Sequence, residues 1–522
     1  MTDRNRAIVI GAGHNGLVCA AYLAQAGRDV LVVEAAERVG GAAVTRELAP
    51  GFRVSACAHL SYLLDAQISR ELELAKHGLK VARANLRTVA LARDGNHLSL
   101  DGGALVSGTL PDADRAALPE YHAQMLKFAR VLGKQHNRRP PRLAGGGRGE
   151  LMSAAMLGLD MRRLGRDSMR EFLRIAGINI FDVLEETFES PLLKGALALD
   201  AVLGTNLGAR SNNSVLSLLH RLSGAAIGVT DGLSLPEGGM GAITDALAGA
   251  ARASGASIRT GSPVTRITLA GDAVSGVELE SGEHLTAGTV VSNADPARTL
   301  LQLLGARHLE TTVVHRVRHF RAKGMAAKLH LALDGLPRFE GLSAENAGER
   351  LVIAPDAHYV ETAFDQAKYG QCSIEPALEI TIPSVHDKTL APAGKHVLSA
   401  VVQYAPFDPG ASTDAARTEF LDRTLGVLER YAPGLRAQVV ASQLLLPADI
   451  EREFRISGGH WHHGELALDQ FLMLRPIPGA AQYAMPVNGL YLCGAGCHPG
   501  GGVMGCAGRN AAQAVLGAER AS

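Results

Sequence analysis

The chain has 522 residues, which is too long for one hydrophobic core, so we expect two or more domains. Lysine and arginine together number 52, as do aspartate and glutamate, and this balance argues against a nucleic-acid partner. The six cysteines form no C-x-x-C pair and no zinc-binding spacing, which favours small buried thiols.

The first residues, MTDRNR, lead at once into an apolar run, so we expect no signal peptide and a cytoplasmic location. The longest stretch without Asp, Glu, Lys or Arg, residues 476–508, is rich in glycine and proline, which excludes a spanning helix there. We therefore expect no transmembrane segment, while peripheral contact with a membrane stays open.

Residues 7–10, AIVI, form a short apolar run typical of a buried parallel strand, and GAGHNG follows directly. In this G-x-G-x-x-G order, Gly11 permits a tight turn and Gly13 lets the backbone approach a pyrophosphate. Gly16 lets the next helix pack closely on the strand, and the helix N-terminus then attracts the phosphates. Gly27 is expected to end that helix.

A second apolar run, residues 30–33, ends in Glu34, 21 positions after Gly13. A carboxylate at this place can accept hydrogen bonds from both ribose hydroxyls of a dinucleotide. Strand, glycines, helix and acid in this order predict an α/β fold with a Rossmann-like domain. They do not distinguish NAD from FAD.

The residues that follow carry a more specific pattern, E-x-x-x-R-x-G-G-x-x-x-T, from Glu34 to Thr45. This pattern resembles that of the FAD-binding amine oxidases and phytoene desaturases. The resemblance implies an FAD domain of the glutathione-reductase type, with Arg38 near the ribose and adenine. It implies FAD contacts at Gly11, Ala12, Gly13, Asn15, Gly16, Glu34, Ala35, Arg38, Gly40, Gly41 and Ala42.

Residues 51–64 approach the isoalloxazine in the flavoproteins that this sequence resembles, so His59 is a candidate catalytic residue. A histidine packed in an ordinary core is the alternative. Short alternating runs over residues 72–106 predict strands, and residues 151–222 have mostly helical periodicity. These helices either cap a substrate tunnel or complete a core.

The motif PEGGMG at residues 236–241 marks the return to the flavin domain in the resembling family, and there the backbone near Val264 contacts the adenine. Strands are predicted at residues 257–260, 264–270, 273–280, 284–293, 328–333, 378–383 and 396–403, and a helix at 413–431.

These two excursions from the first fold predict two discontinuous domains. The FAD-binding domain is expected to comprise residues 1–85, 232–300 and 470–522. An α+β substrate domain is expected to comprise residues 86–231 and 301–469.

Three histidines, His460, His462 and His463, stand beside the only tryptophan. Adjacent histidines rarely point the same way, and no carboxylate is spaced to join them on one helical face, so we expect no metal site. His463 is the second candidate catalytic residue, as a group that orients the substrate or accepts a proton. A structural role is the alternative.

Residues 490–508, LYLCGAGCHPGGGVMGCAG, place a strand before a second glycine turn. Pro499 stands where a third glycine would belong, so we expect no separate NAD(P) site. The stretch resembles the C-terminal flavin motif of carotenoid desaturase-like enzymes, nearest to the pyridine nucleotide-disulphide oxidoreductase domain-containing branch. That resemblance implies a helix from about Val503 and further FAD contacts at Val264, Gly494, Ala495, His498, Gly502, Val503 and Met504.

We therefore expect an FAD-dependent oxidoreductase that removes hydride from a carbon centre of a small hydrophobic substrate, as a phytoene desaturase or carotenoid dehydrogenase does. Oxygen, a quinone or a protein would reoxidise the flavin. The alternatives are an oxidase of amines or alicyclic C–H groups that releases hydrogen peroxide, and a non-catalytic interaction protein with the flavin fold. With 4% aromatic residues, an aromatic cage for an amine is disfavoured. The oligomeric state stays open, a homodimer included.

Overall fold

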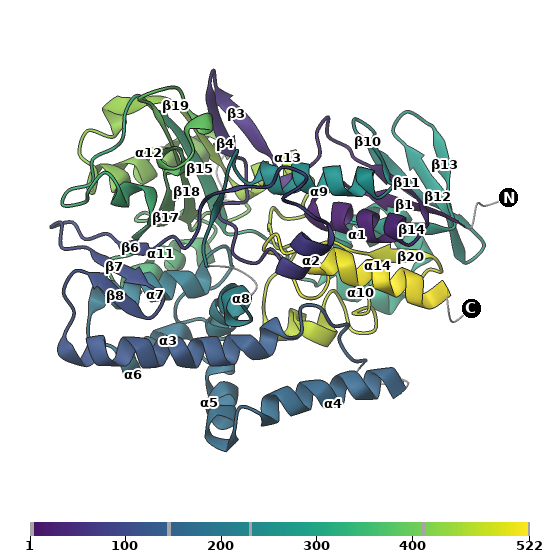
Figure 1. Ribbon diagram of the computed structural model, residues 1–522, viewed down its shortest axis with the longest axis horizontal. Helices are drawn as coiled ribbons and strands as arrows, with labels where there is room; N and C mark the ends of the chain where they lie inside the picture. Colours follow the sequence, from purple (N-terminus) through teal and green to yellow (C-terminus); the bar gives the residue numbers. More distant parts are fainter. Residues whose placement is uncertain (1–4, 143–147, 229–231, 409–412, 520–522) are drawn as a thin grey trace.

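The computed structural model describes residues 5–142, 148–228, 232–408 and 413–519. Two large sheets organise these residues, one of five strands and one of eight (Figure 1). No helix in these ranges is long and apolar enough to cross a membrane.

The five-stranded sheet is parallel and has the order β10-β2-β1-β14-β20. The central strand β1 is almost wholly apolar and buried, as expected of a strand covered on both faces. The strands, drawn from segments far apart in the sequence, are β1 (Arg6–Ile10), β2 (Asp29–Val33), β10 (Ser257–Arg259), β14 (Thr289–Ser292) and β20 (Leu490–Leu492).

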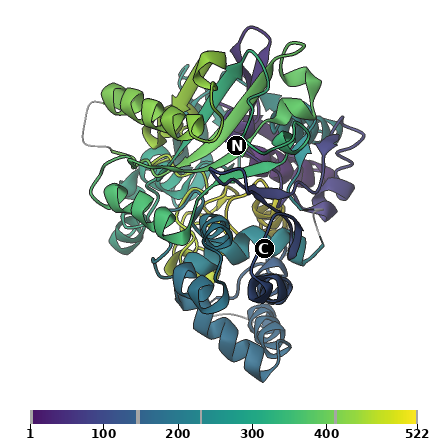
Figure 2. The ribbon, with the colours of Figure 1, turned by 90° about the vertical axis from the view of Figure 1, so that its left-hand side faces the viewer.

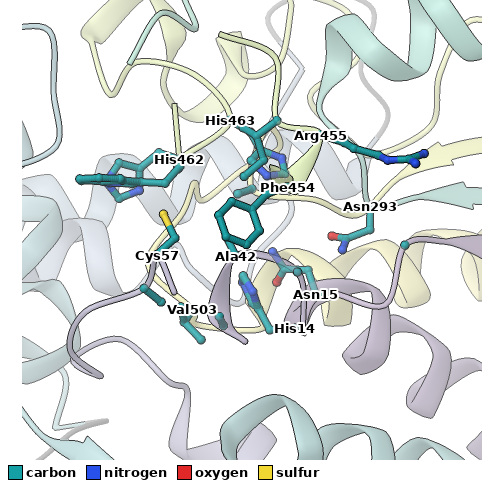
Figure 3. Close-up of a pocket in the computed structure, with 18 of the residues that line it drawn as sticks. His14, Asn15, Ala42, Cys57, Asn293, Phe454, Arg455, His462, His463 and Val503 are labelled. Atoms are coloured by element: carbon teal, nitrogen blue, oxygen red, sulfur yellow. The ribbon is translucent and has the colours of Figure 1, made fainter. Parts of the chain in front are cut away.

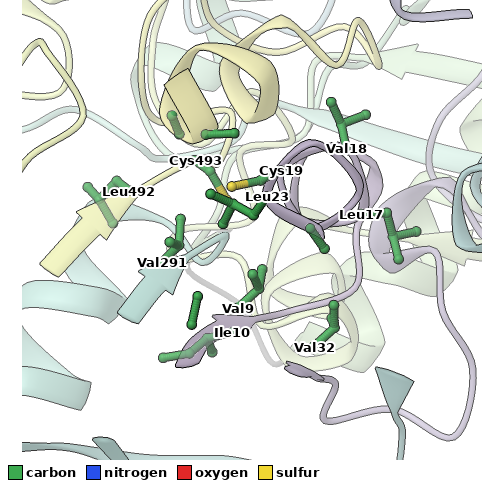
Figure 4. Close-up of a cluster of buried hydrophobic side chains, with 14 of the residues drawn as sticks. Val9, Ile10, Leu17, Val18, Cys19, Leu23, Val32, Val291, Leu492 and Cys493 are labelled. Carbon is green, nitrogen blue, oxygen red and sulfur yellow. The ribbon is translucent and has the colours of Figure 1, made fainter. Parts of the chain in front are cut away.

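Helix α1 (His14–Gln25) packs against both α9 (Gly241–Ala253) and α14 (Cys506–Glu519). Figure 4 shows Cys19 and Leu23 of α1 beside Leu492 and Cys493 from the end of the chain. A three-stranded antiparallel sheet adjoins this unit, formed by β11 (Val264–Ala270), β12 (Ala273–Leu279) and β13 (His284–Thr286). The N-terminal and C-terminal segments thus share one core.

The eight-stranded mixed sheet has the order β19-β15-β18-β17-β16-β6-β7-β8. Its strands β15, β17 and β18 are buried along most of their length. The strands are β6 (Thr88–Ala90), β7 (Leu98–Asp101), β8 (Ala104–Ser107), β15 (Ala326–Leu333), β16 (Arg350–Ile353), β17 (Ala377–Thr381), β18 (His396–Gln403) and β19 (Val439–Leu445).

Helices between residues 112 and 226 gather at one end of the molecule, at the bottom of Figures 1 and 2. They are α3 (Asp112–Gly133), α4 (Arg148–Arg162), α5 (Arg166–Gly177), α6 (Ile180–Thr187), α7 (Pro191–Val202) and α8 (Ser214–Ala226). The remaining helices are α2 (Ala66–Glu71), α10 (Thr311–Arg318), α11 (Ala357–Lys368), α12 (Thr413–Glu429) and α13 (Pro447–Phe454). Two strand pairs complete the fold: β3 (Thr45–Ala49) with β4 (Phe52–Ser55), and β5 (Val81–Arg83) with β9 (Leu235–Pro236).

The predicted fold class is confirmed: a Rossmann-like α/β unit accompanies a second, mixed α/β sheet. The division of the chain at the predicted domain limits stays a prediction. One element was placed wrongly, because α14 begins at Cys506 and not near Val503. Gly502, Val503 and Gly505 have φ values of 124°, 56° and 84°, which are incompatible with a right-handed helix.

Gly508 of α14 tests the close packing of α14 on α1. A Cβ atom at Gly508 would lie 2.1 Å from the Asn15 carbonyl oxygen, whereas one at Gly517 of the same helix would be 3.8 Å from its nearest neighbour. We expect Gly508→Ala to lower the free energy of unfolding by about 2–3 kcal/mol through overpacking. The control Gly517→Ala should be neutral or stabilising by up to about 1 kcal/mol. Urea unfolding of the full chain measures both, and equal effects would contradict the packing argument.

Candidate active site

A cavity of about 1500 Å³, its open mouth included, lies at the carboxyl edge of the parallel sheet. Its lining includes Ile10, Val33 and Asn293, which stand at or just beyond the ends of β1, β2 and β14. Residues 57–60, Tyr62 and residues 461–463 line it as well, and Figure 3 labels Cys57, His462 and His463 among them. In open parallel sheets, ligands bind at this edge, where the strand order reverses.

The glycine turn has the close contacts that the motif predicts. Gly11 has a φ of 93°, and its N–H donates to the Val33 carbonyl at 2.8 Å. A Cβ atom at Gly16 would lie 2.1 Å from the Gly11 carbonyl oxygen, so only glycine lets α1 begin so near β1. A Cβ atom at Gly13 would lie 2.7 Å from Nδ2 of Asn293. The turn therefore presents bare backbone to the cavity.

Glu34 is oriented by backbone amides. Its carboxylate accepts hydrogen bonds from the N–H of Ala12 at 2.6 Å and of Ala36 at 2.9 Å. The side chain lines the cavity, as do Ala35 and Val264. Its position after β2, beside the glycine turn, suits the ribose of a dinucleotide.

Asn15 offers a test of whether a cofactor fits here. The residue has no solvent exposure and lines the cavity, yet neither Oδ1 nor Nδ2 has a hydrogen-bond partner among the described residues. Nε2 of the neighbouring His14 is also without a partner there. Buried polar atoms are normally satisfied. A dinucleotide, rich in phosphate and hydroxyl oxygens, would supply what these side chains lack.

The C-terminal glycine stretch reaches the same cavity. Ala495, Gly502 and Val503 line it together with Gly11, Gly13 and the rest of the N-terminal turn (Figure 3). A Cβ atom at Gly502 would lie 2.4 Å from Cδ1 of Leu63, so a larger residue would collide there. The two glycine-rich ends of the chain thus meet around one space.

Several residues predicted to contact FAD do not line the cavity. Ala12 and Gly40 hydrogen-bond to each other through their backbones, and Gly494 packs on the Asn293 carbonyl. The residues with no place in the lining are Ala12, Gly16, Arg38, Gly40, Gly494, His498 and Met504, whereas Gly41 and Ala42 line the cavity.

Arg38 and His498 depart furthest from the prediction. The Arg38 side chain is exposed and lies outside the lining, and its contact with ribose and adenine stays a prediction. His498 is buried, and its Nε2 lies 2.8 Å from the Gln135 carbonyl oxygen, next to α3. Its ring therefore contacts the protein chain and has no place in the lining.

His59 lines the cavity and hydrogen-bonds through Nδ1 to Nζ of Lys328. Its Nε2 has no hydrogen-bond partner in the described part of the chain and lies 3.9 Å from Oε2 of Glu379. Burial, and then the Lys328 charge, hold the pKa of His59 well below 6.5. The imidazole is therefore neutral at pH 7.

Lys328 is a functional candidate that the sequence analysis missed. It is fully buried in the middle of β15, and this burial lowers its pKa to about 7. A lysine within the buried run AAKLHLAL is a signal that was available in the sequence.

Glu379 lies beside this pair and is neutralised by two arginines. Arg350 donates to it through Nε at 2.6 Å, and Arg221, which also lines the cavity, donates through Nη2. Burial disfavours ionisation of Glu379, but the Arg221 and Arg350 charges outweigh it and lower the pKa. This part of the wall is charged but internally compensated.

His462 and His463 both line the cavity (Figure 3), and Nδ1 of each is unpaired within the described ranges. Burial lowers the pKa of His463 to about 4, so it too is neutral at pH 7. No group of three metal-binding side chains gathers among the described residues.

Arg475, also missed from the sequence, fixes this histidine segment. The guanidinium is fully buried and donates to the carbonyls of His462 at 2.6 Å and Ala495 at 2.9 Å. Further bonds reach the carbonyls of Gly464, Glu465 and Gln470. Arg475 thus joins the histidine segment to the C-terminal glycine turn.

The sequence pattern of the "Flavin containing amine oxidoreductase" family matches residues 16–516. The chain belongs to this family. The protein is accordingly an FAD-dependent oxidoreductase, and the expected resemblance, cofactor and enzyme class are confirmed.

This flavin-containing amine oxidoreductase is similar to other proteins in sequence and in fold. It is 36% identical to pyridine nucleotide-disulfide oxidoreductase domain-containing protein 2 of Rattus norvegicus, over 98% of this chain and 93% of that one. It is 26% identical to the lycopene-forming phytoene desaturase of Pantoea ananas, over 97% and 98%. Cyclohexylamine oxidase of Brevibacterium oxydans has a TM-score of 0.58 at 18% identity, over 99% of each chain, which shows a shared fold.

The buried histidines predict that this flavoprotein loses stability in mild acid. Burial lowers the pKa of His220 and of His498 to about 4, and that of His330 to about 3, from 6.5. Between pH 6.5 and 4 the unfolded chain therefore binds more protons, so stability is complete above this window and is lost as the pH falls through it. Each group would cost about 2 kcal/mol at pH 5.

Urea unfolding at pH 8, 7, 6 and 5 measures this loss. His220→Gln should reduce the dependence on pH, whereas the same change at the exposed His284 should leave it as it is. A free energy of unfolding that stays constant from pH 8 to pH 5 would refute the argument.

Proposed function

We propose that the protein removes a hydride from a carbon centre of a hydrophobic substrate and so introduces a carbon–carbon double bond. The apolar part of the cavity wall carries this proposal. It combines Leu60, Leu203, Val401, Ile456 and Trp461, while the nearby Glu379 carboxylate is already neutralised by arginine. Such a wall favours a hydrocarbon over a cationic amine, which would need an unpaired carboxylate or an aromatic cage.

The similarity to a phytoene desaturase along almost the full length of both chains supports the same substrate class. We propose oxygen or a quinone as the electron acceptor, because the C-terminal glycine stretch lacks the third glycine of an NAD(P) site.

FAD, when bound, accepts the hydride. The substrate must then also lose a proton from the adjacent carbon, and the electron pair of that C–H bond forms the double bond. We assign this proton to His59, which lines the cavity, and to its hydrogen-bond partner Lys328. When Lys328 is neutral, His59 can donate from Nδ1 to Nζ and present a bare Nε2 to the cavity. A proton accepted at Nε2 is then passed on by release of the Nδ1 proton to Lys328.

This role requires neutral Lys328, so we expect the rate of flavin reduction by substrate to rise with pH through about 7 and then level off. The ionisable groups around Lys328 are His59, Cys57, Glu379 and His330. Of these, His59, His330 and Glu379 keep one charge state near pH 7, and burial raises the pKa of Cys57 to about 11, so its thiol stays protonated there. Stopped-flow absorbance from pH 6 to 9 measures the profile.

We expect Lys328→Met and His59→Ala each to slow flavin reduction by about 10²–10⁴-fold while FAD stays bound. In Lys328→Met the rise through pH 7 should also disappear. His463→Ala tests the second histidine in the same assay. Wild-type rates in both Lys328→Met and His59→Ala would remove the pair from the mechanism.

Anaerobic bleaching of the flavin tests the substrate class. We expect isoprenoid and alicyclic hydrocarbons to bleach the visible flavin band, and primary amines, NADH and NADPH to leave it unchanged. Bleaching by amines alone would make the protein an amine oxidase. Rapid bleaching by NADPH would contradict the proposed electron flow, and no bleaching by any compound would favour a non-catalytic role.

A further inference from the structure

Two arginines in the cavity belong to neither the glycine turns nor the proposed proton path. Arg298 begins the π-helical segment η2 (Arg298–Gly305), and Arg455 follows the last residue of α13. Both line the cavity that Gly13 and Asn15 line, and Figure 3 shows Arg455 beside Asn293. Within the described residues, neither guanidinium forms an ion pair with a carboxylate, although the nearby Asp295 and Glu451 partly offset the Arg298 charge. Arg298 is partly buried and Arg455 is exposed, so two cations without a direct carboxylate partner line one space.

Asp295 positions the backbones of both arginine segments. It is 1% exposed, and its Oδ1 accepts a hydrogen bond from the backbone N–H of Arg298 at 2.9 Å. Its Oδ2 accepts one from the backbone N–H of Ser457 at 3.0 Å, two residues after Arg455. Asp295 thus brings the two segments together through backbone amides, and its charge acts on the Arg298 guanidinium without a direct ion pair.

The backbone of Arg455 is a second, independent observation. The residue caps α13 in the left-handed region, with φ 58° and ψ 37°, and its N–H donates to the Glu451 carbonyl at 2.8 Å. Glycine is the usual residue at such a position, because a side chain is strained there. An arginine there is explained if its side chain is used in the cavity.

We propose that Arg298 and Arg455 bind the diphosphate of FAD from the side opposite the glycine turn. The diphosphate is the anionic group of oxidised FAD, and the start of α1 would approach it from the other side. Burial, and then the Arg455 charge, lower the pKa of Arg298, and the Asp295 and Glu451 carboxylates offset this only in part. An anion between the two guanidinium groups would stabilise both. Guanidinium groups suit this task because they bind phosphate oxygens in pairs.

Ligand affinity tests the pair separately from catalysis. The dissociation constants of FAD, ADP and riboflavin are measured on the full-length protein after removal of its flavin, by fluorescence and calorimetry. We expect Arg298→Gln and Arg455→Gln each to weaken FAD and ADP by about 10–100-fold, the loss of a charge-assisted hydrogen bond. Riboflavin, which lacks the diphosphate, should bind as it does to the wild type.

Two further variants separate binding from folding. Arg452→Gln changes an exposed arginine on α13 that pairs with Asp449, and it should leave FAD affinity unchanged. Arg455→Gly removes the side chain but suits the left-handed backbone, so it should weaken FAD while thermal stability is kept or raised. FAD and ADP affinities within twofold of the wild type in Arg298→Gln and Arg455→Gly would overturn the proposal. Equal losses for riboflavin and FAD would overturn it as well.

Discussion

The geometry of the site depends on the close approach of α1 to its neighbours. Gly16 lets the helix begin against the Gly11 carbonyl, and Gly508 lets α14 lie against the Asn15 carbonyl. A Cβ atom at either position would lie 2.1 Å from a backbone carbonyl oxygen, so the helix that carries it would have to move. Because α1 is held from both sides, its N-terminus and Asn15 face the cavity at the carboxyl end of β1. The expected phosphate site and the position of the C-terminal glycine stretch therefore both depend on how α1 is packed.

Burial determines the chemistry of the opposite wall. A lysine and several histidines are buried there, so their charged forms are disfavoured. The histidines are neutral at pH 7, whereas Lys328, with a pKa of about 7, is only partly neutral. The arginines that remain charged are held differently. Arg475 is surrounded by carbonyl oxygens, and Arg350 lies against Glu379. The wall thus combines neutral histidines with charges that are compensated by neighbouring groups.

Arg298 and Arg455 are the exception, since neither forms an ion pair with a carboxylate in the part of the chain that the structure describes. They come from two segments that Asp295 joins. One segment follows β14 and the other follows α13. If they bind the diphosphate, the cofactor itself becomes part of the contact between these segments. Flavin binding and the stability of the site would then be coupled.

The sequence by itself determined the cofactor fold, because the glycine turn and its strands are local. The motif spans only about 25 residues, from Gly11, Gly13 and Gly16 to the acid after the second strand. Its order can therefore be recognised in the sequence. The strands from residue 257 onward were predicted because their apolar runs and turns are also local patterns. The later start of α14 was missed because positive φ values at residues 502–505 leave no periodic signal.

Only the tertiary structure decided which side chains face the cavity. His59 meets Lys328 across 269 positions, and Asp295 reaches Ser457 across 162, so no spacing rule reveals either contact. For the same reason Arg38 and His498, although each lies in a matching motif, have no place in the lining, while Arg298 and Arg455 line the cavity. Local backbone preferences are encoded in neighbouring residues, whereas the burial and pairing of charges depend on the packing of the whole chain.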